Sequence, residues 1–75
     1  MIEELVARTL GIPLPSVTDD LEYSKVPEWD SLNHVNLMIA LEQALQTDIS
    51  EDLMVELTSV RAIRNFADRV GTRPV

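Results

Sequence analysis

A carboxylate, a hydroxyl and an imidazole lie within five residues of one another, at Asp30, Ser31 and His34. Residues three apart on a helix are neighbours on its surface, so Ser31 and His34 could form a nucleophile and its base. A hydrolase also needs a group that orients the base, donors for an oxyanion and a substrate cleft, and the sequence offers none of these. Asp30 and His34 alone supply too few ligands for a metal site. Asp30, Ser31 and His34 therefore do not indicate a catalytic site.

These residues open the most apolar helix that the sequence predicts, over residues 31–46. Pro27 ends the preceding segment, and Asp30 and Ser31 carry side-chain oxygens that can cap free backbone N–H groups. Apolar residues then recur on a helical stripe: Leu32, Val35, Met38, Ile39, Leu41 and Leu45. From the residues alone, Asp30-Ser31 is a capping pair, and His34 is expected at the surface.

The size of the chain limits what it can do. Its 75 residues make one domain, 1–75, and a domain of this size buries only about 60% of its unfolded surface. Without cysteine it has neither a disulfide nor a thiolate metal site. The few aromatic residues, Tyr23, Trp29 and Phe66, predict an aliphatic core. The longest apolar run, 37–41, is too short to cross a bilayer, and no signal peptide is recognisable. The absence of cysteine fits a cytoplasmic protein, and we expect a monomer without membrane contact.

Charge is distributed unevenly along the chain, whose net charge is −7. Residues 1–56 carry twelve acidic and two basic side chains, a net −10, whereas residues 57–75 carry +3. An acidic surface repels phosphate backbones, which argues against nucleic acid as a partner and favours basic patches on other proteins. The arginines of residues 59–70 are expected to form a solvated face, or to pair with nearby acids, rather than to bind a membrane.

The first part of the chain predicts one helix and a long connection. Residues 2–10 form the helix, which Gly11 ends. Residues 11–30 form the connection, in which a short helical turn around Asp19–Tyr23 is one option. Its apolar residues can anchor it to the core: Ile12, Leu14, Val17, Leu21 and Val26.

Two further helices follow the central one. Ser50 is expected to cap a short helix at 51–56, and Thr58 or Ser59 to cap a fourth. Gly71 ends the fourth helix, and residues 71–75 form a frayed tail. No segment alternates with the period of a strand. The sequence thus predicts an all-α four-helix bundle of three longer helices and a short third one, with a long loop between helices 1 and 2.

The central stretch resembles a known family in the pattern Asp30-Ser31-Leu32-x-x-Val35-x-Leu37-x-x-Ala40-Leu41-Glu42. Downstream, Asp48-Ile49 is similar to the acid–isoleucine step before that family's third helix. Thr58-Ser59-Val60-Arg61 is similar to the threonine–valine start of its fourth helix. Together with the length, the acidity and the helix order, the likeness covers residues 2–70. The family that the chain resembles is that of the acyl carrier proteins.

The resemblance implies a carrier rather than an enzyme. Ser31 would receive a 4'-phosphopantetheine arm from coenzyme A, transferred by a phosphopantetheinyl transferase with Mg²⁺. Acyl intermediates would then travel on the arm as thioesters between separate loading and processing enzymes. The positive end of a helix dipole is a favourable place for the phosphate.

The resemblance also implies recognition residues. Asp30 would bind the transferase, and Glu42 would keep part of an acidic stripe. Partner enzymes would touch an apolar patch: Leu32, Val35, Ile39 and Met54. We expect Leu32 and Met54 to be exposed, whereas the sequence fits either an exposed or a core position for Val35 and Ile39.

The chain departs from fatty-acid-synthesis carriers along the central helix. Where those carriers often have acids, this sequence has Asn33, Asn36, Gln43 and Ala44. Fewer acids weaken docking to enzymes that recognise them with arginine and lysine. We therefore hypothesise a specialised freestanding carrier of a polyketide-like or other secondary pathway. The alternatives are a carrier of aminoacyl or peptidyl units and a small acidic helical adaptor without a prosthetic group.

Overall fold

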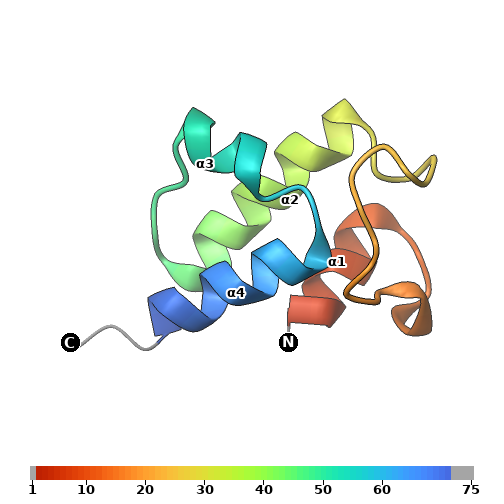
Figure 1. Cartoon of the computed structure of the whole chain (residues 1–75), viewed down its shortest axis with the longest axis horizontal. Helices are drawn as coiled ribbons and strands as arrows, with labels where there is room; N and C mark the ends of the chain where they lie inside the picture. Colours follow the sequence, from red (N-terminus) through yellow and green to blue (C-terminus); the bar gives the residue numbers. More distant parts are fainter. Residues whose placement is uncertain (1, 72–75) are drawn as a thin grey trace.

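The computed structural model describes residues 2–71, which contain four α-helices and one 3₁₀ turn. In chain order they are α1 Ile2–Leu10, η1 Leu14–Ser16, α2 Ser31–Leu45, α3 Glu51–Glu56 and α4 Val60–Gly71. The predicted all-α bundle with a short third helix and a long loop before the second is confirmed (Figure 1). Residues 72–75 of the predicted tail lie outside the described residues, and Gly71 is the last residue of α4.

The helices enclose one core. α2 packs against α1 and α4, and α1 also contacts α4. Among residues 2–71, six apolar side chains are fully inaccessible to solvent: Val6, Trp29, Leu37, Leu41, Val60 and Ile63. The prediction of an aliphatic core is wrong in one respect, because the largest of these side chains is the indole of Trp29. The residue directly before the α2 cap thus lies in the interior.

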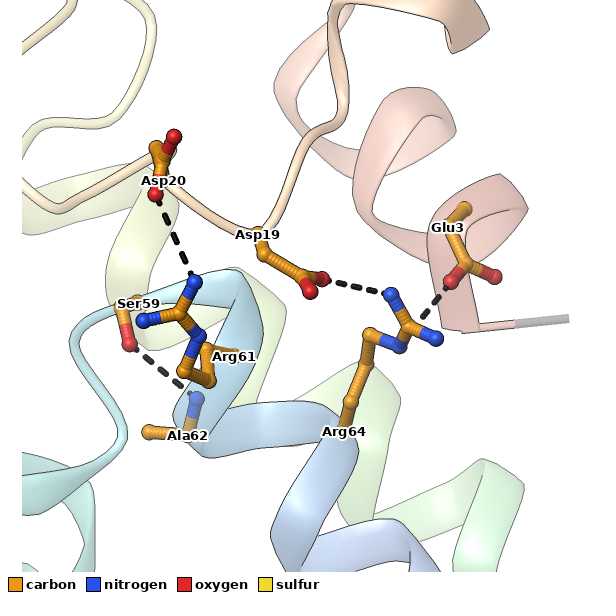
Figure 2. Close-up of polar contacts among 7 residues, drawn as sticks. All are labelled: Glu3, Asp19, Asp20, Ser59, Arg61, Ala62 and Arg64. Atoms are coloured by element: carbon orange, nitrogen blue, oxygen red, sulfur yellow. Dashed lines mark hydrogen bonds and ion pairs between the residues drawn. The ribbon is translucent and has the colours of Figure 1, made fainter.

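Local signals set the ends of the helices as predicted. Gly11 adopts the left-handed conformation (φ 70°) and donates its N–H to the Ala7 carbonyl, which ends α1. The Ser50 hydroxyl accepts the Leu53 N–H at 3.2 Å and caps α3. The Ser59 hydroxyl accepts the Ala62 N–H at 3.1 Å, so Ser59 rather than Thr58 caps α4 (Figure 2).

The loop between α1 and α2 is anchored at most of the predicted positions. Val17 is buried, and three other predicted anchors pack against the core with part of their surface exposed: Ile12, Leu21 and Val26. The prediction that Leu14 is an anchor is wrong, since 48% of this residue is exposed. The helical turn also lies earlier than Asp19–Tyr23, at η1, where Pro15 favours its backbone angles.

Backbone hydrogen bonds join this loop to the segment between α3 and α4. Tyr23 donates its N–H to the Thr58 carbonyl at 2.8 Å, and Val60 donates to the Leu21 carbonyl at 3.0 Å. Between them, Glu22 and Ser59 form an isolated antiparallel bridge. The loop is therefore held beside the start of α4, and Tyr23 is fixed at the backbone.

Two arginines of α4 pair with acidic side chains. Pairing with nearby acids was one of the two predictions for these arginines, the other being a solvated face. Arg64 contacts both Asp19 of the loop and Glu3 of α1, and Arg61 lies 3.5 Å from Asp20 (Figure 2). The pKa of Glu3 lies below its usual value. The main cause is a hydrogen bond to the carboxylate from the Glu3 backbone N–H, and the Arg64 guanidinium contributes less. These pairs are largely exposed, so each adds little to stability. They do bring the basic end of the chain against its acidic loop.

Candidate functional site

The start of α2 is a fully formed N-cap. Asp30 has an extended backbone (φ −100°, ψ −175°), and its carboxylate accepts the Asn33 N–H at 2.9 Å. The Asn33 side chain in turn donates to the Glu28 carbonyl at 2.7 Å. The predicted capping role thus belongs to Asp30, and Ser31 is the first residue of the helix. The Ser31 side chain takes no part in the cap.

Ser31 presents its hydroxyl at the positive end of a 15-residue helix. The residue is exposed, and its Oγ lies 2.9 Å from the Tyr23 hydroxyl. Of the first three N–H groups of α2, that of Asn33 is taken by Asp30. Those of Ser31 and Leu32 have no hydrogen-bond partner among residues 2–71. An accessible hydroxyl beside free N–H groups suits a phosphate ester, because both the donors and the helix dipole favour an anion.

Apolar side chains are exposed along α2 beyond Ser31. Leu32 is 71% exposed, as predicted, and Val35 and Ile39 are 44% and 47% exposed, so neither belongs to the core. Met54 of α3, which we expected to be exposed, is instead half-buried and packs against the core. Exposure of several large apolar side chains on neighbouring turns is typical of a surface that meets another protein.

The sequence interpretation missed Val55, which is 75% exposed on α3. A signal was available, since α3 has only six residues and its apolar run is Leu53-Met54-Val55. Successive residues of a helix point in different directions, so one short helix cannot bury all three. Val55 is therefore a further exposed apolar side chain near the start of α2, where it lines a hollow with Tyr23, His34 and Met54.

Glu42 takes part in the fold itself. Its Oε2 accepts the Ile49 N–H at 2.9 Å, which ties α2 to the segment before α3. The side chain is half-buried.

His34 is buried, which corrects the expectation that it lies at the surface. Only 8% of it is exposed. Trp29 Nε1 donates to His34 Nδ1 at 3.0 Å, and His34 Nε2 lies 2.9 Å from the Met54 carbonyl oxygen. An indole N–H can only donate, so Nδ1 must accept and the proton of the neutral ring is on Nε2, which donates to Met54. The histidine links the segment before α2 to α3.

The hydrogen bonds of His34 also rule it out as a base for Ser31. Both ring nitrogens are engaged, one by an indole and the other by a carbonyl group. The ring instead contacts Tyr23, with centroids 5.1 Å apart and planes at 52°. Among residues 2–71 no group of three potential metal ligands occurs, and none of these helices is long and apolar enough to cross a membrane. The site presents an accessible hydroxyl, and His34 is not placed to act as its base.

A comparison with known protein families agrees with this geometry. The family described as the phosphopantetheine attachment site matches residues 2–67, which is most of the chain. Its members are non-catalytic carriers that bind 4'-phosphopantetheine covalently and work with a phosphopantetheinyl transferase and with other partner enzymes. The predicted cofactor is therefore confirmed, and the chain belongs to the phosphopantetheine-dependent carrier proteins.

Proposed function

We propose that the chain is an acyl carrier protein whose single domain, residues 1–75, holds the 4'-phosphopantetheine arm on Ser31. The observation that carries this proposal is the exposed Ser31 hydroxyl on the first residue of α2, beside two free N–H groups. Asp30 performs the capping, so Ser31 can be modified without loss of the cap. The arm supplies a terminal thiol for thioesters, which is why the chain itself needs no cysteine.

Attachment changes only one bond of the protein. Ser31 Oγ forms a bond to phosphorus, its proton passes to the transferase, and the phosphoanhydride bond of coenzyme A breaks, releasing adenosine 3',5'-bisphosphate. Ser31 loses its donor in this step and keeps an oxygen that can only accept. The exposure of the hydroxyl gives the transferase access without any unfolding of α2.

Intact-mass measurement after incubation with coenzyme A and a transferase tests the proposal. We expect the chain to gain the mass of one phosphopantetheine and Ser31→Ala to gain none. Alanine is a good helix former, so the first turn of α2 should persist, which circular dichroism can verify. Ser16→Ala, which removes an exposed hydroxyl from η1, is the matched control and should be modified normally. No gain with any transferase would favour a helical adaptor, and a gain in Ser31→Ala would place the arm elsewhere.

Recognition by partners is proposed to use the surface around Ser31. The exposed side chains of Leu32, Val35 and Ile39, together with Met54, would form the apolar patch for partner enzymes, with Glu42 at its acidic margin. Asp30 would provide a negative charge for the transferase. Because Asp30 is exposed and also caps α2, its charge and its capping role must be tested separately.

Two substitutions separate these roles of Asp30. Asn caps a helix about as well as Asp, whereas Ala costs about 1 kcal/mol of stability. We expect Asp30→Asn to melt like the wild type but to lower kcat/KM of modification about tenfold, the size of a lost charge-assisted contact of about 1.4 kcal/mol. Asp52→Asn, an exposed acid of α3, controls for net charge and should leave the rate unchanged. Equal rates of modification for Asp30→Asn and the wild type would show that the transferase does not recognise the charge of Asp30.

The pathway is proposed to be a specialised one, polyketide-like or otherwise secondary. The four uncharged residues of α2 at positions where acids are frequent support this: Asn33, Asn36, Gln43 and Ala44. Few charges on this helix weaken attraction to basic docking surfaces. Normal loading and elongation by a complete fatty-acid synthase would contradict the proposal. Loading by an amino-acid-activating enzyme would instead identify an aminoacyl or peptidyl carrier.

A further inference from the structure

Tyr23 is held beside Ser31 by contacts on three sides. Its backbone N–H donates to Thr58 at 2.8 Å, its ring lies against His34 at 5.1 Å, and its hydroxyl lies 2.9 Å from Ser31 Oγ. His34 is in turn fixed by Trp29 and by the Met54 carbonyl. The phenol therefore has a defined position, although it belongs to a loop eight residues before Ser31.

Modification of Ser31 leaves only one direction for a hydrogen bond between Tyr23 and Ser31. In the free protein either hydroxyl can donate to the other. Once Ser31 Oγ is an ester oxygen it has no proton, so the phenol must be the donor. The strongest acceptors within reach of such a donor are the charged non-bridging oxygens of the phosphate, because a hydrogen bond to an ionised group is shorter and stronger than one between neutral groups.

We propose that the Tyr23 hydroxyl is a ligand of the phosphodiester in the modified protein. This inference rests on the proposed attachment at Ser31. The phenol would act with the free N–H groups at the start of α2, so the phosphate would be bound both by the helix and by the loop. Tyr23 is a positioning residue here, because it would bind the phosphate of the arm and takes no part in bond formation. Its place is set before modification, so little ordering is needed on attachment.

The composition of the chain provides a direct reporter for this contact. Tyr23 is the only tyrosine, so a sample labelled with ¹³C at the tyrosine ζ carbon gives one resonance. The phosphodiester gives one ³¹P resonance. We expect attachment of the arm to move the Tyr23 resonance in the otherwise unchanged chain. A phenol that stays in its original environment would give the same resonance before and after attachment.

A matched pair of variants completes the test. Tyr23→Phe removes only the hydroxyl, and the ring contact with His34 and the bond to Thr58 can persist. We expect its ³¹P resonance to differ from that of the modified wild type. Thr18→Val, which removes an exposed hydroxyl from the same loop, should leave the ³¹P resonance in place.

The two proposals fail in different ways. Both resonances are recorded only on protein that mass measurement shows to be modified, so absence of modification contradicts the attachment function itself. Modified wild type with an unmoved Tyr23 resonance, or a ³¹P resonance in Tyr23→Phe that coincides with that of Thr18→Val, overturns the role of Tyr23 and leaves the function of Ser31 intact. An unmoved Tyr23 resonance overturns the role without any variant, so the proposal stays falsifiable even if Tyr23→Phe folds poorly.

Discussion

Replacement of Trp29 by alanine is expected to lower the free energy of unfolding by about 3–5 kcal/mol, the usual cost of deleting a large buried ring. The side chain is fully buried, and its N–H donates to His34 Nδ1 at 3.0 Å. A domain of this size has a total stability of only about 4–11 kcal/mol. The variant should therefore be largely unfolded in modest urea concentrations that leave the wild type folded.

Two controls separate the contributions to this loss. Trp29→Phe keeps an aromatic ring and removes the N–H, so it should cost less than Trp29→Ala. Leu32→Ala truncates an apolar residue that is 71% exposed and should change stability by less than about 0.5 kcal/mol. Urea unfolding followed by circular dichroism measures all three. Burial of two methylene groups contributes about 1.6 kcal/mol. If the free energy of unfolding of Trp29→Ala lay within about 1 kcal/mol of the wild-type value, the ring would not support the core.

Replacement of His34 by leucine is expected to cost about 2–4 kcal/mol, although leucine is the more apolar residue. Two buried or half-buried groups would lose their partner, the Trp29 N–H and the Met54 carbonyl. Leaving such a group unsatisfied costs about 1–3 kcal/mol. The loss should be accompanied by faster amide exchange in α3, because His34 is the side chain that joins α2 to the Met54 backbone.

His34→Asn provides the matched comparison for His34→Leu. The Asn Oδ1 can take the place of Nδ1 as acceptor for Trp29, but its side chain is too short to reach Met54 as a donor. We expect an intermediate stability, with the exchange of α3 amides as fast as in His34→Leu. Fluorescence of Trp29, the only tryptophan, reports unfolding in both variants. A His34→Leu protein as stable as the wild type would mean that the two hydrogen bonds contribute nothing net.

Much of the fold could be predicted because its determinants are local. A cap such as Ser50 or Ser59 acts on a backbone N–H three residues away, and Gly11 permits a left-handed backbone wherever it stands. The same holds for Asp30, whose carboxylate reaches Asn33. Helix order and the position of Ser31 on the first turn of α2 followed from such signals, whereas the family followed from the resemblance of the central stretch.

The burial of α2 could not be predicted from its periodicity. The helix is apolar on more than one side, so one stripe does not identify the core. In the structure Leu37, Met38 and Leu41 are buried, whereas Leu32, Val35 and Ile39 are exposed. The packing of α1 and α4 decides between these sets, since burial depends on which neighbours cover a residue.

The opening residues of α2 show both kinds of information. By itself, the sequence determined that Asp30-Ser31 opens the helix as a capping pair and that a hydroxyl lies at Ser31, because capping needs only nearby backbone. Tertiary structure alone decided that His34 is buried between Trp29 and Met54, and that Tyr23 reaches Ser31. These contacts join a loop and two helices, so they depend on how distant segments pack, which no local pattern encodes.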